Sequence, residues 1–273
     1  MTLTCATYNI LHGYHRELIL KNIRFLIDQG ADVICLQEAE VRFEEPLKAL
    51  LAQPELSHWR AECGHAGRGG NVATLWNTRT LTLKHAHLVE LPRLRTPGTL
   101  QLLRGLVETI QRAALVAEFD WGGKSLQVGN AHLAWEGGSR HRMRQLTHVR
   151  KELEKRPAEF RIVTGDFNTL AHRLRRRAQE KRVEKTLGAE FRNAFPKMPW
   201  TYDISYNDPT DGLQFIMTLA RASGVKWRQR FDYMFASDMT VIEGKMHDLP
   251  GSDHRPLIAT FSVDKDRQAA VAR

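Results

Sequence analysis

Strand-like runs that are apolar on both faces constrain the fold of this chain more than any other feature. A strand that is hydrophobic on both sides must be covered from both sides, so each sheet needs a layer above it and a layer below it. Runs of this kind are DVICLQ at 32–37, RAALVAEF at 112–119, FRIVTG at 160–165 and RPLIATFSV at 255–263. Further strand-like runs lie at 2–8, 71–76, 80–91, 125–131 and 230–236.

Helical spacing occurs between some of these strands. Ile19, Ile23, Leu26 and Ile27 share one helix face, and Gly30 is placed to end that helix. Two further apolar stripes are Leu47, Leu50 and Leu51, and Met143, Leu146, Val149 and Leu153. Strands outnumber helices and some strands follow one another directly, so a purely parallel doubly wound sheet fits poorly. Two packed sheets flanked by helices fit better.

Residues 80–91 alternate between apolar and polar positions, which places six side chains on one strand face. These are Leu81, Leu83, His85, His87, Val89 and Leu91. Because no further ligand accompanies the two histidines, we interpret them as structural or solvent-facing residues.

The chain is 273 residues long with no repeat, low-complexity tract or flexible linker. We expect a single domain over 1–264, followed by a flexible tail at 265–273. No apolar run approaches the ~18 residues that a transmembrane helix needs, and the N-terminus lacks the pattern of a signal peptide. The odd number of cysteines, Cys5, Cys35 and Cys63, indicates reduced thiols and favours a cytoplasmic location.

Positive charge is concentrated in two segments. The formal net charge is +9, and residues 140–156 and 171–185 each hold seven basic and two acidic residues. Such patches favour a polyanionic partner, although solvated helix faces would explain them too. The stripe beginning at Met143 accounts for the first segment as an ordinary surface helix. The second segment offers only Leu174, Ala178 and Val183 for burial, so packing explains its arginines less well.

Polar and acidic residues gather where the apolar strands end or begin. A carboxylate just beyond a buried strand has a rigid base and an exposed tip, which suits a site held by a scaffold. Any one of these residues alone is commonly a turn or cap residue. The residues are Asn9, Glu38, Asn130, His132, Asp166, Asn168, Asp232, Asp253 and His254.

Six motifs in order resemble those of the endonuclease/exonuclease/phosphatase superfamily. They are TYNILHG (7–13), LQEAE (36–40), GNAHL (129–133), GDFN (165–168), RFDYMF (230–235) and SDHRPL (252–257). The resemblance runs from about residue 3 to 262 and implies a four-layered α/β sandwich, with two packed mixed β-sheets flanked by helices. Apurinic endonucleases of the superfamily carry a tyrosine in place of His132, so GNAHL favours the histidine-bearing branch.

The resemblance also implies a metal site. Glu38 is the principal metal ligand it assigns, with Asn9 and Asp253 nearby as ligands or water holders. Carboxylate and amide oxygens without a cysteine cluster favour Mg²⁺ or Mn²⁺ over zinc.

The catalytic roles come from the same resemblance. Asp166 is expected to orient and deprotonate the attacking water, while Asn168 and His132 hold non-bridging oxygens. His254, polarised by Asp232, is expected to remain cationic and to stabilise the charge that builds at phosphorus.

Substrate contacts are less sharply indicated. Tyr202 lies in a stretch that resembles the substrate-side loop of sphingomyelinase-like and tyrosyl-DNA-phosphodiesterase-like members, although its neighbour Asp203 would equally cap a turn. Arg112 and Arg144 recur in bacterial relatives, where arginine meets phosphate bidentately, and a plain surface role fits them as well. In the second basic segment the candidates for contact with flanking phosphates are Arg173, Arg175, Arg176 and Arg177.

These observations together predict a Mg²⁺-dependent phosphoesterase, most simply a phosphodiesterase that hydrolyses DNA or RNA through in-line attack of an activated water. A phospholipid or inositol-phosphate phosphoesterase is the alternative, because its substrate, or an anionic membrane surface, would attract the same basic segments. A catalytically dead polyanion-binding module is a remote third reading, since the carboxylates and His254 are all retained.

Overall fold

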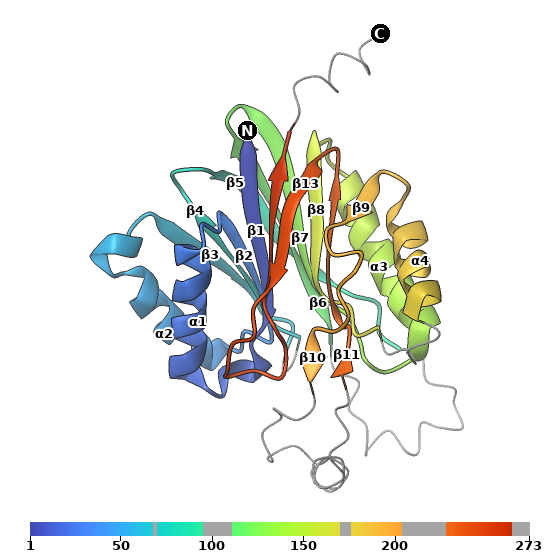
Figure 1. The fold of residues 1–273 in the computed structure, drawn as a ribbon, viewed down its shortest axis with the longest axis horizontal. Coiled ribbons are helices and arrows are strands. Elements are labelled where there is room, and N and C mark those ends of the chain that lie inside the picture. Colours follow the sequence, from blue (N-terminus) through green and yellow to red (C-terminus); the bar gives the residue numbers. More distant parts are fainter. Residues whose placement is uncertain (68–69, 95–110, 170–175, 204–227, 264–273) are drawn as a thin grey trace, which may run out of the picture.

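A computed structural model gives the fold of the chain and describes residues 1–67, 70–94, 111–169, 176–203 and 228–263. Two six-stranded sheets pack against each other, with α1 and α2 outside one and α3 and α4 outside the other (Figure 1). The expected four-layered α/β sandwich is confirmed. The helices are α1 (Arg16–Asp28), α2 (Val41–Leu51), α3 (Gly138–Glu154) and α4 (Arg176–Leu187), with short 3₁₀ turns η1 (Leu11–Gly13) and η2 (Pro54–Leu56).

The first sheet has the strand order β13-β14-β1-β2-β4-β3. Its strands are β1 (Thr2–Asn9), β2 (Val33–Gln37), β3 (Trp59–Gly64), β4 (Val72–Asn77), β13 (Thr240–Met246) and β14 (Leu257–Ser262). Within this order β1 and β2 run parallel, with Asn9 opposite Gln37, and every other neighbouring pair is antiparallel. The carboxyl ends of β1 and β2 therefore meet at one edge.

The second sheet has the order β5-β6-β7-β8-β12-β9. Its strands are β5 (Thr82–Glu90), β6 (Ala113–Trp121), β7 (Lys124–His132), β8 (Phe160–Asp166), β9 (Phe191–Asn193) and β12 (Asp232–Ser237). Here β7 and β8 are the parallel pair, with His132 opposite Asp166. A separate two-stranded ribbon joins β10 (Tyr202–Asp203) to β11 (Arg228–Gln229).

Three apolar clusters fill the spaces between the layers. The cluster between the sheets draws Cys5 and Cys35 from the first sheet and Val128 and Ile162 from the second. A second cluster lies between the first sheet and α1 and α2, and a third between the second sheet and α3 and α4. The central strands are thus buried on both faces, as their apolar runs predict. No helix in the described ranges is both long enough and apolar enough to cross a membrane.

The expected helix boundaries hold where the pattern is strong. Gly30, with a φ of 83°, lies two residues beyond the end of α1 and just after its C-cap residue, Gln29. The stripe beginning at Met143 faces the third cluster. In α4 Val183 is buried as expected, but Ala178 is exposed, so that part of the prediction is wrong. The predicted tail at 265–273 lies outside the described residues.

The prediction that six residues of 80–91 share one face is also wrong. The pairing of β5 with β6 shifts by one residue between Leu83 and His85, which is a β-bulge. A bulge reverses the alternation. Leu81 and Leu83 therefore pack between the sheets, whereas Val89 packs in the cluster beneath α3. His87 lies 3.7 Å from the Glu152 carboxylate of α3, between Nε2 and Oε2.

Candidate active site

The ends of the two parallel strand pairs bring the acidic and amide side chains together. Asn9 ends β1 and Glu38 directly follows β2 in the first sheet, while His132 ends β7 and Asp166 ends β8 in the second. His132 Nε2 lies 3.8 Å from Glu38 Oε1 and 3.6 Å from Asp166 Oδ2. The packing of one sheet on the other thus places residues separated by more than a hundred positions in one cluster.

Asn9 links the two carboxylates at the centre of this cluster. Its Nδ2 donates to Asp166 Oδ2 at 3.0 Å and to Glu38 Oε1 at 3.3 Å, and its Oδ1 accepts from the Leu11 amide at 3.0 Å. Both polar atoms of this buried amide are hydrogen-bonded, and its Nδ2 connects Glu38 beside the first sheet to Asp166 of the second.

His254 approaches the cluster from the loop before β14. Its Nδ1 lies 2.8 Å from Asp232 Oδ2, and its Nε2 lies 3.7 Å from Asp166 Oδ2. Asp232 begins β12 directly opposite Asp166 in the antiparallel pair, which explains why both carboxylates reach the same ring. Ser252 ties the loop to β1, because its hydroxyl donates to the Asn9 carbonyl at 2.7 Å.

Burial and charge shift the protonation equilibria of this cluster. Burial raises the pKa of Asp166 to about 7 and that of Asp253 to about 6. Burial alone would lower the pKa of His254, but the carboxylates of Asp232 and Asp166 outweigh it and raise the pKa to about 10. His254 therefore carries a positive charge at neutral pH, while the neighbouring carboxyl groups of Asp166 and Asp253 gain or lose their protons close to neutral pH.

Asn168 and Arg112 complete the surroundings of Asp166 and His132. The Asn168 amide N–H donates to Asp166 Oδ1 at 2.8 Å, and its Nδ2 donates to the Leu133 carbonyl at 2.9 Å. An Arg112 guanidinium nitrogen lies 2.9 Å from His132 Nε2, and Arg112 is buried. Of the predicted substrate-binding arginines, Arg112 is therefore placed at this cluster.

Tyr202 also lies against the cluster, with its ring 5.0 Å from the ring of His254 in an edge-on contact. Its neighbour Asp203 is buried and pairs with Arg228, with Oδ2 2.8 Å from Nε. The Thr201 hydroxyl accepts from the backbone amides of Phe231 and Asp232, both at 3.0 Å. This stretch therefore buttresses the strand that carries Asp232.

Within the part of the chain that the structure describes, no other arginine predicted to bind substrate is placed at the cluster. Arg144 is exposed on α3 and Arg177 is exposed on α4. Arg176 is the first residue of α4, and its side chain is outside what the structure describes. Arg173 and Arg175 lie outside the described residues altogether.

Two residues at the cluster were missed in the sequence analysis. His12 places Nε2 3.1 Å from Glu38 Oε2 and Nδ1 3.0 Å from Glu40 Oε1, so it joins two glutamates. Arg142 is 3% exposed, and burial lowers the pKa of its guanidinium. The nearby Asp166 carboxylate partly offsets this lowering. The stripe on α3 carried the signal for Arg142, because Arg142 and Leu146 are four residues apart and share a helix face.

The cluster fits a hard divalent cation. Glu38, Asp166 and Asp253 bring carboxylate oxygens to the cluster, Glu38 Oε2 has only the His12 ring nitrogen at 3.1 Å among the ion pairs of the described residues, and burial raises the pKa values of Asp166 and Asp253. No group of three His, Cys, Asp or Glu in the described ranges forms a ready metal cage. Mg²⁺ commonly takes one or two carboxylates and completes its shell with water and substrate oxygens.

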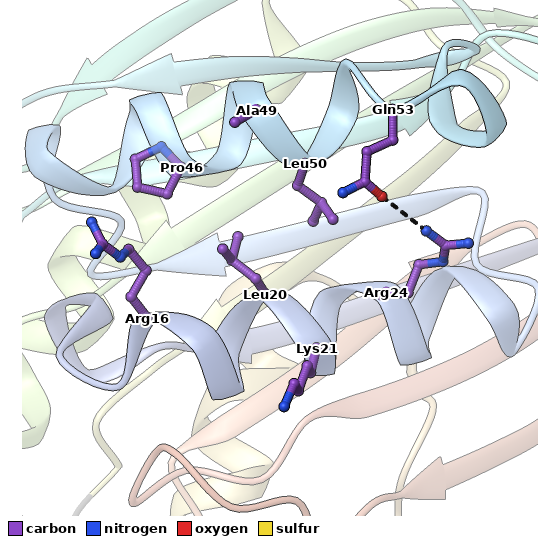
Figure 2. A pocket seen from close by; sticks show the side chains of 8 residues that line it. All are labelled: Arg16, Leu20, Lys21, Arg24, Pro46, Ala49, Leu50 and Gln53. Carbon is purple, nitrogen blue, oxygen red and sulfur yellow. Dashed lines mark hydrogen bonds between the residues drawn. The ribbon is translucent and has the colours of Figure 1, made fainter.

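A hollow of about 480 Å³ lies elsewhere, between α1 and α2, and Figure 2 shows its lining. Arg24 reaches across it to Gln53, with a hydrogen bond of 3.2 Å. None of its lining residues belongs to the cluster at the strand ends. They are Arg16, Leu20, Lys21, Arg24, Pro46, Ala49, Leu50 and Gln53.

Comparison with solved structures places this fold among known proteins. The structure of D. rerio TDP2 complexed with single strand DNA product is similar with a TM-score of 0.69 and 18% identity, over 96% of this chain and 99% of that chain. An endonuclease/exonuclease/phosphatase from Bacteroides vulgatus gives 0.68 at 15% identity, over 97% and 100%. The human Nocturnin catalytic domain with bound sulfate anion gives 0.63 at 18%, over 96% and 94%.

At these identities the similarity to solved structures concerns the fold. Among curated proteins, no sequence matches this chain significantly. The model of the Endonuclease/Exonuclease/phosphatase family, however, matches residues 6–254, which include every residue of the cluster. The chain belongs to this family and is a phosphoric ester hydrolase.

Proposed function

We propose that this chain is a Mg²⁺- or Mn²⁺-dependent phosphodiesterase that hydrolyses DNA or RNA by in-line attack of an activated water. The observation that carries the proposal is the contact of Asp166 with Asn9 on one side and His254 on the other. This contact connects the proposed base Asp166, the imidazolium of His254 and, through Asn9, the proposed metal ligand Glu38 within hydrogen-bond or ion-pair distances.

Asp166 serves as the group that orients and deprotonates the water. Its pKa of about 7 suits a general base that works near neutral pH. Both carboxylate oxygens are held, Oδ1 by the Asn168 amide and Oδ2 by Asn9. Because these donors fix the carboxylate plane, the remaining lone pairs point in a set direction toward the water.

His254 serves as the donor that stabilises charge on the phosphoryl oxygens. Asp232 holds Nδ1, which leaves Nε2 directed toward Asp166 and hence toward the reacting phosphorus. The imidazolium is charged and held in place before the reaction begins. A charge that is already in position stabilises the transition state effectively, because no rearrangement of the site is needed when charge develops on the substrate. His132 and Asn168 hold the non-bridging oxygens.

Glu38 would be the principal protein ligand of the metal, with Asp253 and Asn9 beside it. A bound divalent ion supplies Lewis-acid stabilisation of the charge that develops at phosphorus. Members of this family generally depend on divalent metals, which supports the assignment.

Two observations support a nucleic acid substrate. The basic segments 140–156 and 171–185 overlap the helices α3 and α4, which pack side by side. Phosphate backbones bind such surfaces by counterion release. A similar structure, that of D. rerio TDP2, is complexed with single strand DNA product.

The decisive experiment is a panel of phosphoesters with Mg²⁺, comparing the wild type with Asp166→Asn as the inactive control. Single-stranded and double-stranded DNA, RNA, sphingomyelin and inositol phosphates form the panel. We expect Mg²⁺-dependent turnover of at least one nucleic acid that Asp166→Asn abolishes. Turnover confined to sphingomyelin or inositol phosphates would refute the nucleic-acid assignment and support the lipid alternative.

Metal binding by Glu38 can be measured separately from turnover. Glu38→Gln keeps the size of the side chain and removes its charge, so Mg²⁺ affinity should fall while the fold is retained. Calorimetric titration with Mg²⁺ tests this. An affinity equal to that of the wild type would remove Glu38 from the metal site.

A further inference from the structure

Trp135 presents an exposed indole three residues beyond His132. It is 60% exposed, and it is the aromatic member of the small set of large hydrophobic side chains exposed in the described ranges. Three residues span at most about 11 Å, so the backbone of Trp135 lies within about that distance of His132 in the cluster at the strand ends. Single exposed apolar residues are common on protein surfaces, so exposure alone decides nothing.

The backbone that leads to Trp135 is held rigidly. The Leu133 amide donates to the Asp166 carbonyl at 2.8 Å, and the Leu133 carbonyl accepts from Asn168 Nδ2 at 2.9 Å. Leu133 and Ala134 are both buried. The start of the loop is therefore hydrogen-bonded to Asp166 and Asn168, two residues of the proposed reaction centre. These bonds fix the position of the loop relative to the scissile phosphate.

The far side of the loop is fixed by α3. The Ala134 amide donates to Gln145 Oε1 at 2.8 Å, and the Trp135 carbonyl accepts from an Arg142 guanidinium at 3.0 Å. Gly137, with a φ of 80°, then turns the chain into the helix. A Cβ there would meet His141 and Leu94 at 3.0 and 2.7 Å, so the tight turn requires glycine. Such a loop orders no further backbone when a ligand stacks on the indole, which lowers the entropic cost of binding.

Exposed positive charge follows the indole immediately. Arg140 and Arg144 lie in the first two turns of α3, are exposed, and share a helix face because they are four residues apart. Proteins that bind single strands combine aromatic side chains, on which bases stack, with cations that follow the phosphates. Trp135, Arg140 and Arg144 supply both kinds of exposed side chain within one short stretch that begins at the site residue His132.

We propose that Trp135 is the stacking platform for the nucleobase next to the scissile phosphate, and that Arg140 and Arg144 contact the phosphate beyond it. This inference rests on the proposed function and narrows its substrate to single-stranded nucleic acid, because a base must leave the duplex to lie on an indole. Arg144, which does not face the reacting cluster, thereby acquires a substrate contact away from the chemistry.

The test compares Trp135→Ala, Trp135→Phe and the matched control Ile242→Ala, whose side chain is 57% exposed on β13. Each protein is assayed on a single-stranded oligonucleotide and on the same strand with abasic nucleotides flanking the scissile phosphate. We expect Trp135→Ala to raise KM for the normal strand about five- to a hundredfold, the effect of losing one stacked base. Its kcat should stay within about twofold, and Trp135→Phe should restore most of the affinity.

The abasic strand separates stacking from other effects. It should bind wild type and Trp135→Ala equally weakly, and Ile242→Ala should match the wild type on both strands. An equal loss on both strands, or none on either, would overturn the role of Trp135 while leaving the proposed function intact. A loss seen only on phospholipid vesicles would overturn it in favour of membrane contact. Absence of nucleic-acid turnover in the wild type would instead refute the proposed function.

Discussion

Asn130 offers a direct test of how the two sheets are held in register at the site. It lies on β7 of the second sheet, fully buried, and its side chain reaches into the first sheet. Its Oδ1 accepts from Gln37 Nε2 at 2.7 Å, and its Nδ2 donates to the carbonyls of Leu36 and Ala73 at 3.0 and 2.9 Å. Gln37 immediately precedes Glu38, so this amide fixes the base of the proposed metal ligand.

The expected cost of Asn130→Ala follows from these three hydrogen bonds. A typical intramolecular hydrogen bond contributes about 0.5 to 1.5 kcal/mol net, so losing three should lower the free energy of unfolding by about 3 kcal/mol. Gln37 Nε2 keeps its other acceptors, the Thr7 hydroxyl and the Cys35 carbonyl, both at 3.1 Å. It is therefore not left unsatisfied, and we add no penalty for a buried donor without a partner.

Urea unfolding of wild type, Asn130→Ala and Asn77→Ala measures this cost. Asn77 ends β4 at the surface, where its Oδ1 accepts one bond from the Arg79 amide at 2.9 Å, so its loss should cost under about 1 kcal/mol. A change in midpoint with an unchanged slope would report stability alone. If Asn130→Ala loses no more than Asn77→Ala, the amide does not hold the sheets together and the reasoning fails.

Three further predictions concern the reaction and the substrate. Asp166→Asn and His254→Ala should each lower kcat by about a hundredfold or more with a much smaller change in KM, and a near-normal kcat in either variant would contradict its role. NMR titration of His254 should show that its pKa of about 10 falls in Asp232→Asn, because one of the carboxylates that raise it is gone. The imidazolium contributes stability below its ordinary pKa of 6.5, and this contribution is lost as the pH rises through the pKa in the folded state. The loss should therefore begin at a lower pH in the variant than in the wild type. Changing the four arginines of 171–185 that the sequence singles out to glutamine should raise KM for a polynucleotide and flatten its salt dependence, while a small chromogenic diester is hydrolysed within about twofold of the wild type.

The layered fold was predictable because burial on both strand faces leaves a strong mark on the sequence. Val128 and Ile162 face the space between the sheets, while Ala131 and Val163 on the same strands face the helices. Most positions on both faces are apolar, so the runs read as nearly continuous apolar segments. The gathering of polar residues at one cluster was predictable for a related reason. Polar and acidic residues at the ends of such segments stand out against them, whereas the roles assigned to these residues stay predictions.

The parts that sequence did not reveal depend on contacts that leave no local pattern. The bulge in β5 follows from its pairing with β6, and no residue between Leu83 and His85 signals it. Strands β9 and β11 are three and two residues long and form because β12 and β10 lie beside them. The choice between Arg142 and Arg144 depended on the rotation of α3 about its axis, which is set by packing.

Backbone strain in this chain is concentrated where the sheets meet the site. Among the described residues, five non-glycine positions have a positive φ, and four of them, Leu11, His12, Glu38 and Asn168, flank the cluster. Conformations of this kind cost about 1 to 3 kcal/mol each and persist only where surrounding contacts determine them. Here those contacts come from the fully buried strand β2, which ends at Gln37 just before Glu38, and from β8, which is buried along most of its length and ends at Asp166. The doubly buried strands therefore do more than fill the core. They supply the rigidity that keeps Glu38 in its positive-φ conformation, directed toward Asn9 and His12. At the end of a less buried strand, the same residue would relax to an unstrained backbone conformation.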